Sequence, residues 1–218
     1  MYVPTPTQRA SQPTTGPWWL LIGPGFAALI GLFLLTVIYR FDGESPLQID
    51  LGISSQSLLL NGVVAYVVAA ALAFPAGLLL GGRFPTSVTV PALVFMLLGV
   101  VLVAFMPSSG LLLVGRVLNG LGAGAVLGVT VALIRRLQAG RGIAAGVTAG
   151  LGVLALVLAP VLGGLLSDAT GFRVAFIVAA LFVFVALVVA GILGIVALAK
   201  PKPLPYAGPS VSETPQRH

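Results

Sequence analysis

Arg116 is the residue of this sequence best placed to do chemistry. Residues 111–136 read LLLVGRVLNGLGAGAVLGVTVALIRR, an apolar stretch long enough to cross a bilayer, and Arg116 lies inside it. A charge within a membrane span is costly, and it usually faces the interior of a helix bundle or a water-filled path for ions or substrates. Alternatively, the arginine lies near the outer interface and pairs with a backbone carbonyl or with Asp168.

Three uncharged polar residues are further candidates for substrate binding or coupling. Asn61 and Tyr66 lie inside the apolar stretch 58–80, and Asn119 follows Arg116 by about one helical turn. Side chains of this kind inside a span line a cavity or form hydrogen bonds to a neighbouring helix. For Asn61 and Tyr66 the sequence leaves both interpretations open.

Residues for catalysis or metal binding are scarce. The chain has no cysteine, and its single histidine is the terminal His218, so a thiolate or histidine metal site is not expected. We also expect no enzymatic activity and no cofactor, because no nucleophile–base pair or phosphate-binding loop is present. No carboxylate lies inside a predicted span, which counts against proton-coupled transport by this chain alone. The carboxylates, all in predicted loops or tails, are Asp42, Glu44, Asp50, Asp168 and Glu213.

The composition places these candidates in a membrane. Of the 218 residues, 58% are hydrophobic and 7% are charged, and the mean hydropathy is +1.13. Soluble domains carry about 25% charged residues, so lipid must be the solvent for most of this surface. The net charge of +6 would suit nucleic acid in a soluble protein. Here the basic residues lie at the ends of apolar runs, which indicates membrane topology and no nucleic-acid partner.

The pattern of apolar runs predicts an all-α integral membrane protein with six transmembrane helices in one bundle. Residues 1–16 and 200–218 are predicted to be disordered tails, and residues 17–199 form the bundle. The third span is almost wholly aliphatic and is expected to face lipid. The expected spans are residues 18–39, 58–80, 88–105, 111–136, 143–166 and 174–198.

The basic residues also predict an orientation. If the spans alternate, most lysines and arginines fall on one side, and only Arg40 and Arg173 fall on the other side with the acidic residues. Positive charge concentrates on cytoplasmic loops, so both termini are expected in the cytoplasm and the chain in the plasma membrane. The residues on the predicted cytoplasmic side are Arg9, Arg83, Arg135, Arg136, Arg141, Lys200 and Lys202.

Glycines at regular spacing predict close helix packing. Gly120, Gly124 and Gly128 recur every fourth residue on one helix face, and Gly146 belongs to a similar series in the fifth span. Pro160 removes a backbone donor inside that span, so the helix should bend or open there, and a neighbouring helix can satisfy the freed carbonyl. The expected packing or hinge residues are Gly120, Gly122, Gly124, Gly128, Gly146, Pro160 and Gly163.

Four stretches resemble the amino-terminal six-helix half of a major facilitator superfamily transporter, most closely its drug:proton antiporter branch. The resemblance covers residues 51 to 190 and is carried by LGISSQSLLLNGVVAYVVAAALAFPAG, LLLVGRVLNGLGAGA, GVTAGLGVLALVLAPVLGG and SDATGFRVAFIV. It implies that Arg116 serves proton or substrate coupling and that the glycine faces act as sliding surfaces. One departure is the loop GLLLGGRFP, which keeps Gly77 but has Gly81 where the family has an aspartate, leaving Arg83 as its only charge.

The resemblance covers one half of such a transporter, and this shapes the functional hypotheses. The first is a half-size transporter that forms a homodimer, or pairs with a second six-helix chain, and exports small amphipathic solutes, with protons as a possible coupling ion. The alternative is a membrane scaffold or subunit that keeps the half-bundle fold without transporting. A third interpretation is a truncated product with no activity.

Overall fold

The computed structural model describes residues 18–40, 43–105, 108–137 and 139–199, and the two predicted tails lie outside these ranges. All regular secondary structure in the described residues is helical. A 3-10 turn, η1 (Trp18–Leu21), leads into α1 (Ile22–Thr36). The remaining elements are α2 (Pro46–Leu51), α3 (Ser55–Leu58), a π-helical turn η2 (Leu59–Val64), α4 (Ala65–Gly81), α5 (Pro85–Phe105), α6 (Ser109–Arg136), α7 (Arg141–Thr170) and α8 (Phe172–Ala199).

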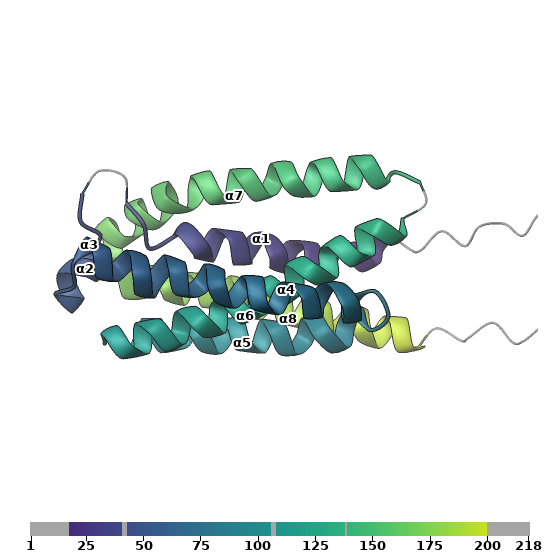
Figure 1. The fold of residues 1–218 in the computed structure, drawn as a ribbon, viewed down its shortest axis with the longest axis horizontal. Helices are drawn as coiled ribbons and strands as arrows, with labels where there is room; N and C mark the ends of the chain where they lie inside the picture. The colour runs from purple at the N-terminus through teal and green to yellow at the C-terminus, as the bar shows by residue number, and fades with distance from the viewer. Residues whose placement is uncertain (1–17, 41–42, 106–107, 138, 200–218) are drawn as a thin grey trace, which may run out of the picture.

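The long helices form one bundle with α6 at its centre (Figure 1). Helix α6 packs most extensively against α4 and α5 and also contacts α1, whereas α7 lies mainly against α1 and α8. The start of α1 and the end of α8 lie at the same end of the bundle, which is also where α6 ends and α7 begins (Figure 1). The odd and even spans therefore run in alternating directions, as a membrane bundle requires.

The expected all-α membrane bundle is confirmed, with its first apolar helix shorter than predicted. Five helices are long and apolar enough to cross a membrane: Ser55–Gly81, Pro85–Phe105, Ser109–Arg136, Arg141–Thr170 and Phe172–Val196. The first apolar helix, Ile22–Thr36, is shorter than the predicted span 18–39. A side chain from α6 completes the hydrogen bonding at its end, as described below.

Two predicted loops contain more helix than expected. The long loop 40–56 holds α2, whose N-terminus is fixed by a capping box between Ser45 and Gln48 and whose C-terminal Gly52 is left-handed with φ of 60°. The predicted polar loop 167–173 is largely helical, because α7 continues to Thr170. Gly171 alone turns the chain, with φ of 87°, a conformation that residues with a side chain rarely adopt.

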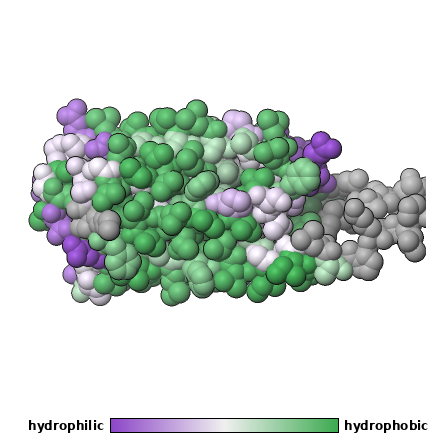
Figure 2. All heavy atoms as spheres, turned by 90° about the horizontal axis from the view of Figure 1, so that it is seen from below, coloured by the Kyte–Doolittle hydropathy of each residue, from purple (hydrophilic) through white to green (hydrophobic). Residues whose placement is uncertain are grey.

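The surface has separate apolar and hydrophilic regions, as expected for a membrane protein. Apolar side chains cover the sides of the bundle, and hydrophilic ones gather at its two ends (Figure 2). The expectation that the third span is a lipid-facing scaffold is wrong for one of its faces. Helix α5 buries Leu93, Met96 and Val100 completely, because it packs between α6 and α8.

Candidate functional site

Arg116 is completely buried and links three parts of the bundle. Its Nε donates to the carbonyl of Gly62 at 2.9 Å, Nη1 to that of Leu34 at 2.7 Å and Nη2 to that of Leu35 at 2.9 Å. A guanidinium offers five N–H donors in a rigid planar fork, so one side chain can bind acceptors on two other helices. Arg116 thus joins α6 to the end of α1 and to η2.

The α1 carbonyls bound by Arg116 are groups that a helix end leaves without partners. The last four C=O groups of an α-helix have no intrahelical donor. In α1, backbone N–H groups from the following turn satisfy the first and last of these, on Phe33 and Thr36. Arg116 satisfies the two between them, on Leu34 and Leu35. The cation also lies at the negative end of the helix dipole, so this contact stabilises the early end of α1.

The segment opposite Arg116 departs from regular α-helix. In η2 the N–H of Ala65 bonds to the carbonyl of Leu60, five residues earlier. Such π-turns shift backbone groups out of their usual register and often occur at functional sites. Gly62, within this turn, presents its carbonyl to Arg116. Its lack of a side chain is needed, because a Cβ there would overlap with Ile38 of the chain leaving α1.

Tyr66 completes the surroundings of the guanidinium. The Arg116 Cζ lies 5.1 Å from the centre of the Tyr66 ring, within range of a cation–π interaction. The buried Tyr66 hydroxyl donates to the carbonyl of Gly31 on α1. The sequence left open whether Tyr66 lines a cavity or bonds to a neighbouring helix. In the structure it bonds to a neighbouring helix. Asn61 is half-buried in η2, and its side-chain amide makes no hydrogen bond with the other described residues.

Asn119 lies apart from this group and faces α5. It is completely buried, and neither its Oδ1 nor its Nδ2 has a hydrogen-bond partner among the described residues. A Cβ at Gly99 would lie 2.6 Å from the Asn119 Oδ1, so the amide is packed directly on the α5 backbone. Buried amides without partners are rare in folded proteins, which makes Asn119 an unusual feature of the core.

The glycines of α6 bring its backbone against both neighbours. A Cβ at Gly120, Gly124 or Gly128 would overlap with the α4 backbone, and one at Gly122 would overlap with α5. Absence of side chains is therefore what allows α6 to lie so close to α4 and α5. The contacted α4 residues are, in the same order, Tyr66, Ala70 and Phe74.

Helix α7 is attached to α1 at the position of its internal proline. Pro160 has no N–H, so the carbonyl four residues earlier, on Leu156, lacks its helical donor. The hydroxyl of Thr36 on α1 donates to that carbonyl at 3.0 Å. One turn further along α7, Gly163 lies against Val37, where a Cβ would come within 2.7 Å of the valine side chain.

Gly146 differs from the packing predicted for it. A Cβ at Gly146 would have no atom from another part of the described chain within 4 Å, and the same holds for Gly142 and Gly150. The reason is geometric: α7 is held to α1 through its second half, and its first half has few contacts with α6. This glycine face is open in the single chain.

An ion pair that the sequence did not predict joins the segment after α1 to the last turn of α7. Arg40 holds Asp168 in a bidentate pair, with Nη1–Oδ1 and Nη2–Oδ2 distances of 2.6 and 2.7 Å. The side chains are 25% and 44% exposed, so the pair contributes about 0–1 kcal/mol. The sequence did place Arg40 and Asp168 on the same predicted side of the membrane, and this was the signal from which the pair could have been predicted. Asp168 is thus paired with Arg40 and not with Arg116.

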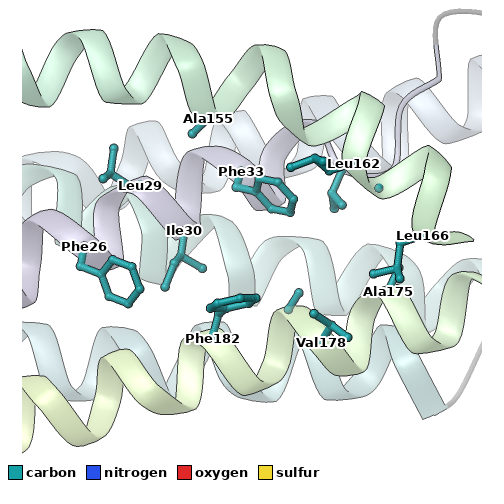
Figure 3. Close-up of a pocket in the computed structure, with 13 residues that line it drawn as sticks. Phe26, Leu29, Ile30, Phe33, Ala155, Leu162, Leu166, Ala175, Val178 and Phe182 are labelled. Carbon is teal, nitrogen blue, oxygen red and sulfur yellow. The ribbon is translucent and has the colours of Figure 1, made fainter.

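An apolar cavity of about 380 Å³ lies between α1, α7 and α8. Figure 3 shows the rings of Phe26, Phe33 and Phe182 around it, with Leu162 and Val178 further along. No charged side chain and no side-chain hydroxyl or amide lines it, so it can hold an apolar group but cannot orient a polar one. Among the described residues, no three His, Cys, Asp or Glu side chains are grouped to hold a metal ion.

Comparison with known protein families agrees with this architecture of one central glycine-rich helix and five apolar neighbours. The family model described as Major Facilitator Superfamily matches residues 25–216, which is most of the chain. The chain belongs to the Major Facilitator Superfamily. The resemblance drawn from the sequence motifs is thereby confirmed for the superfamily, and the chain is a multi-pass membrane protein. A comparison with curated proteins finds no match.

Proposed function

We propose that this superfamily member is a half-size transporter that works as a homodimer, or with a second six-helix chain, and exports small amphipathic solutes. Members of the superfamily are membrane transporters, and their substrate sites lie at the interface between two related halves. The described chain forms one bundle of apolar helices. A second bundle is therefore needed to enclose a transport path of that kind.

The open glycine face of α7 is the observation that supports pairing of this bundle with a second one. A Cβ placed on Gly142, Gly146 or Gly150 would have no neighbour within 4 Å, although these glycines lie in a membrane-spanning helix. Small residues on such helices permit close approach of another helix. The exposed face of α8 instead carries bulky residues such as Leu181 and Ile195, which suit lipid. The α7 face is the better surface for a partner bundle.

The orientation proposed from the sequence has both termini in the cytoplasm and the chain in the plasma membrane. In support, Arg83, Arg135, Arg136 and Arg141 all lie at the end of the bundle where the described chain starts and stops. Basic residues concentrate on cytoplasmic loops.

A coupling role for Arg116, Asn61, Tyr66 and Asn119 requires movement of the bundle. Arg116 and Asn119 are completely buried, and Arg116 is bonded to carbonyls of α1 and η2. A cargo group or proton can reach the guanidinium only if α1 or η2 moves away from it. Within this proposal, the π-turn and the early end of α1 are the places where that movement begins.

The same contacts favour the alternative of a scaffold or subunit without transport. Three helix carbonyls occupy the donors of Arg116 that a substrate anion would otherwise use. An arginine in this setting can serve the fold alone.

The decisive experiment combines stoichiometry with transport. Native mass spectrometry of the detergent-purified chain should show a dimer, or a complex with a second six-helix chain when purified from cells. Gly146→Trp should disrupt it, while Leu181→Trp, on the lipid-facing side of α8, should leave it intact. Reconstituted vesicles should then show efflux of an amphipathic dye for the intact complex only. Efflux by an isolated monomer would refute the pairing, and a stable complex without efflux would support the scaffold.

A further inference from the structure

One end of the bundle carries unbalanced positive charge. The arginines that close α4, α6 and the α6–α7 connection all lie at this end, while Glu44, Asp50 and Asp168 lie at the other (Figure 1). The guanidinium groups of Arg135 and Arg141 form no ion pair or hydrogen bond with any described residue. No described acidic group neutralises their charge, so the two guanidinium groups can bind an anion.

A groove of about 450 Å³ leads from these two arginines into the membrane-spanning part of the bundle, between α1, α6 and α7. Arg135 and Arg141 lie at its mouth, and its walls are otherwise almost entirely apolar, with Leu127, Val131 and Ala149 among them. From Arg141 to Leu156 the groove follows α7 for about 22 Å, given a rise of about 1.5 Å per residue. That length exceeds the depth of one leaflet, about 15 Å, or half of the hydrocarbon core.

The mouth of the groove gains further positive potential from α7 itself. The helix begins at Arg141, its N-cap is Gly140 without a side-chain cap, and its first turn holds no acidic residue. The positive end of the helix dipole is therefore not compensated locally and adds to the two guanidinium charges.

We propose that this groove binds one anionic phospholipid, with its phosphate between Arg135 and Arg141 and an acyl chain along the apolar walls. A soluble anion would use the arginines but not the apolar length of the groove. A zwitterionic lipid would use the walls, but its cationic headgroup would lie close to both arginines and weaken the attraction of its phosphate. Basic sites between transmembrane helices are suited to acidic lipid headgroups. This inference is independent of whether the chain transports a solute.

The neighbouring arginine supplies a matched control. Arg136 follows Arg135 directly, but its guanidinium lies over Gly82 at the end of α4, within 2.9 Å of a Cβ built there. It does not line the groove. Replacing Arg136 and Arg83 removes the same charge from the same end of the bundle as replacing Arg135 and Arg141.

The test is native mass spectrometry of the full chain titrated with phosphatidylglycerol or phosphatidylcholine. The unmodified chain should retain one phosphatidylglycerol and bind phosphatidylcholine much more weakly. R135Q/R141Q should weaken phosphatidylglycerol binding by about 30-fold, since each arginine near a membrane surface contributes about fivefold. R83Q/R136Q should change it less than threefold. Equal losses in the two double variants would overturn the proposal, because net charge would then explain binding.

A second pair of variants tests the apolar part of the site without changing charge. Ala149→Phe fills the groove and should reduce phosphatidylglycerol binding, whereas Leu181→Phe on α8 should not. Unchanged binding to the Ala149 variant would place the lipid elsewhere and refute the site. Inorganic phosphate at millimolar concentration should not displace the lipid; full displacement would show a site for soluble anions. Thermal unfolding of each variant verifies that it is folded.

Discussion

Arg116 on α6 donates a hydrogen bond to the carbonyl of Leu34, one of the last carbonyls of α1. This contact relates two features that are separate in the sequence, a charge inside one span and the early end of another. Without an external donor, a helix that ends inside the bundle leaves carbonyls unpaired in a medium without water. The arginine supplies two such donors to α1 and a third to η2, so its first role is to complete backbone hydrogen bonding.

Replacement of Arg116 should therefore destabilise the fold. Arg116→Ala leaves the α1 carbonyls of Leu34 and Leu35 without a described donor, each costing about 1–3 kcal/mol when buried, removes the bond to Gly62, and opens a cavity in place of a large side chain. Relief from burying a charge offsets part of this loss. We expect a net loss of about 3 kcal/mol, seen as a lower melting temperature and a lower yield in detergent.

Arg116→Lys separates structure from coupling. Lysine keeps the charge and can donate to one or two of the carbonyls, but it lacks the planar fork. It should recover about half of the lost thermal stability. If both variants remain as stable as the unmodified chain yet abolish efflux together, Arg116 acts in coupling, and the structural interpretation is wrong.

The two glycine series predict opposite responses to the same substitution. Gly124→Leu forces a side chain into the backbone of Ala70 on α4, so the two helices must separate and leave voids. We expect the melting temperature to fall by several degrees. Gly146→Leu adds a side chain where no other described helix lies within 4 Å of the Cβ, so the monomer should keep its melting temperature. An equal effect at both positions would contradict the asymmetric packing of α6 and α7.

The topology can be tested with single cysteines, since the chain has none of its own. Glu44 and Ser87 are both exposed and lie at opposite ends of the bundle. With both termini in the cytoplasm, Glu44→Cys should react with an impermeant maleimide in intact cells, and Ser87→Cys only after permeabilisation. Ser45 is less suitable, because it is buried and caps α2. Labelling of both sites in intact cells would reject the alternating arrangement.

The sequence predicted the parts of this fold that depend on local pattern. Apolar length located the spans, and the four-residue spacing of Gly120, Gly124 and Gly128 indicated the face of α6 that packs closely. The partner of that face could not be predicted, because a glycine interval is the same whether the next helix belongs to this chain or to another. Gly146 shows the consequence, since its similar spacing belongs to a face that is open here.

The candidate site was harder to predict because its acceptors are backbone groups. Every residue has a carbonyl, so nothing in the sequence singles out Gly62, Leu34 or Leu35 as partners of Arg116. These carbonyls belong to the π-turn and to the early end of α1, and neither feature has a local sequence signal that we recognised. The sequence identified the unusual donor, and the structure was needed to find what it binds.

The hydrogen bond from Thr36 to the carbonyl of Leu156 gives the last prediction, a double-mutant cycle at the proline of α7. Thr36→Val removes the only donor described for this carbonyl and should cost about 1–2 kcal/mol, while Thr36→Ser keeps the hydroxyl and most of the stability. Pro160→Ala returns a backbone N–H at the position that normally donates to Leu156.

In the Pro160→Ala background the threonine hydroxyl is no longer needed, so Thr36→Val should cost less than about 0.5 kcal/mol there. The two substitutions are then strongly coupled, as expected for groups that serve one acceptor. Thermal unfolding of the four chains in the same detergent measures this coupling. Additive losses would mean that Thr36 contributes by packing against α7, and that the carbonyl freed by Pro160 obtains its stabilisation in another way.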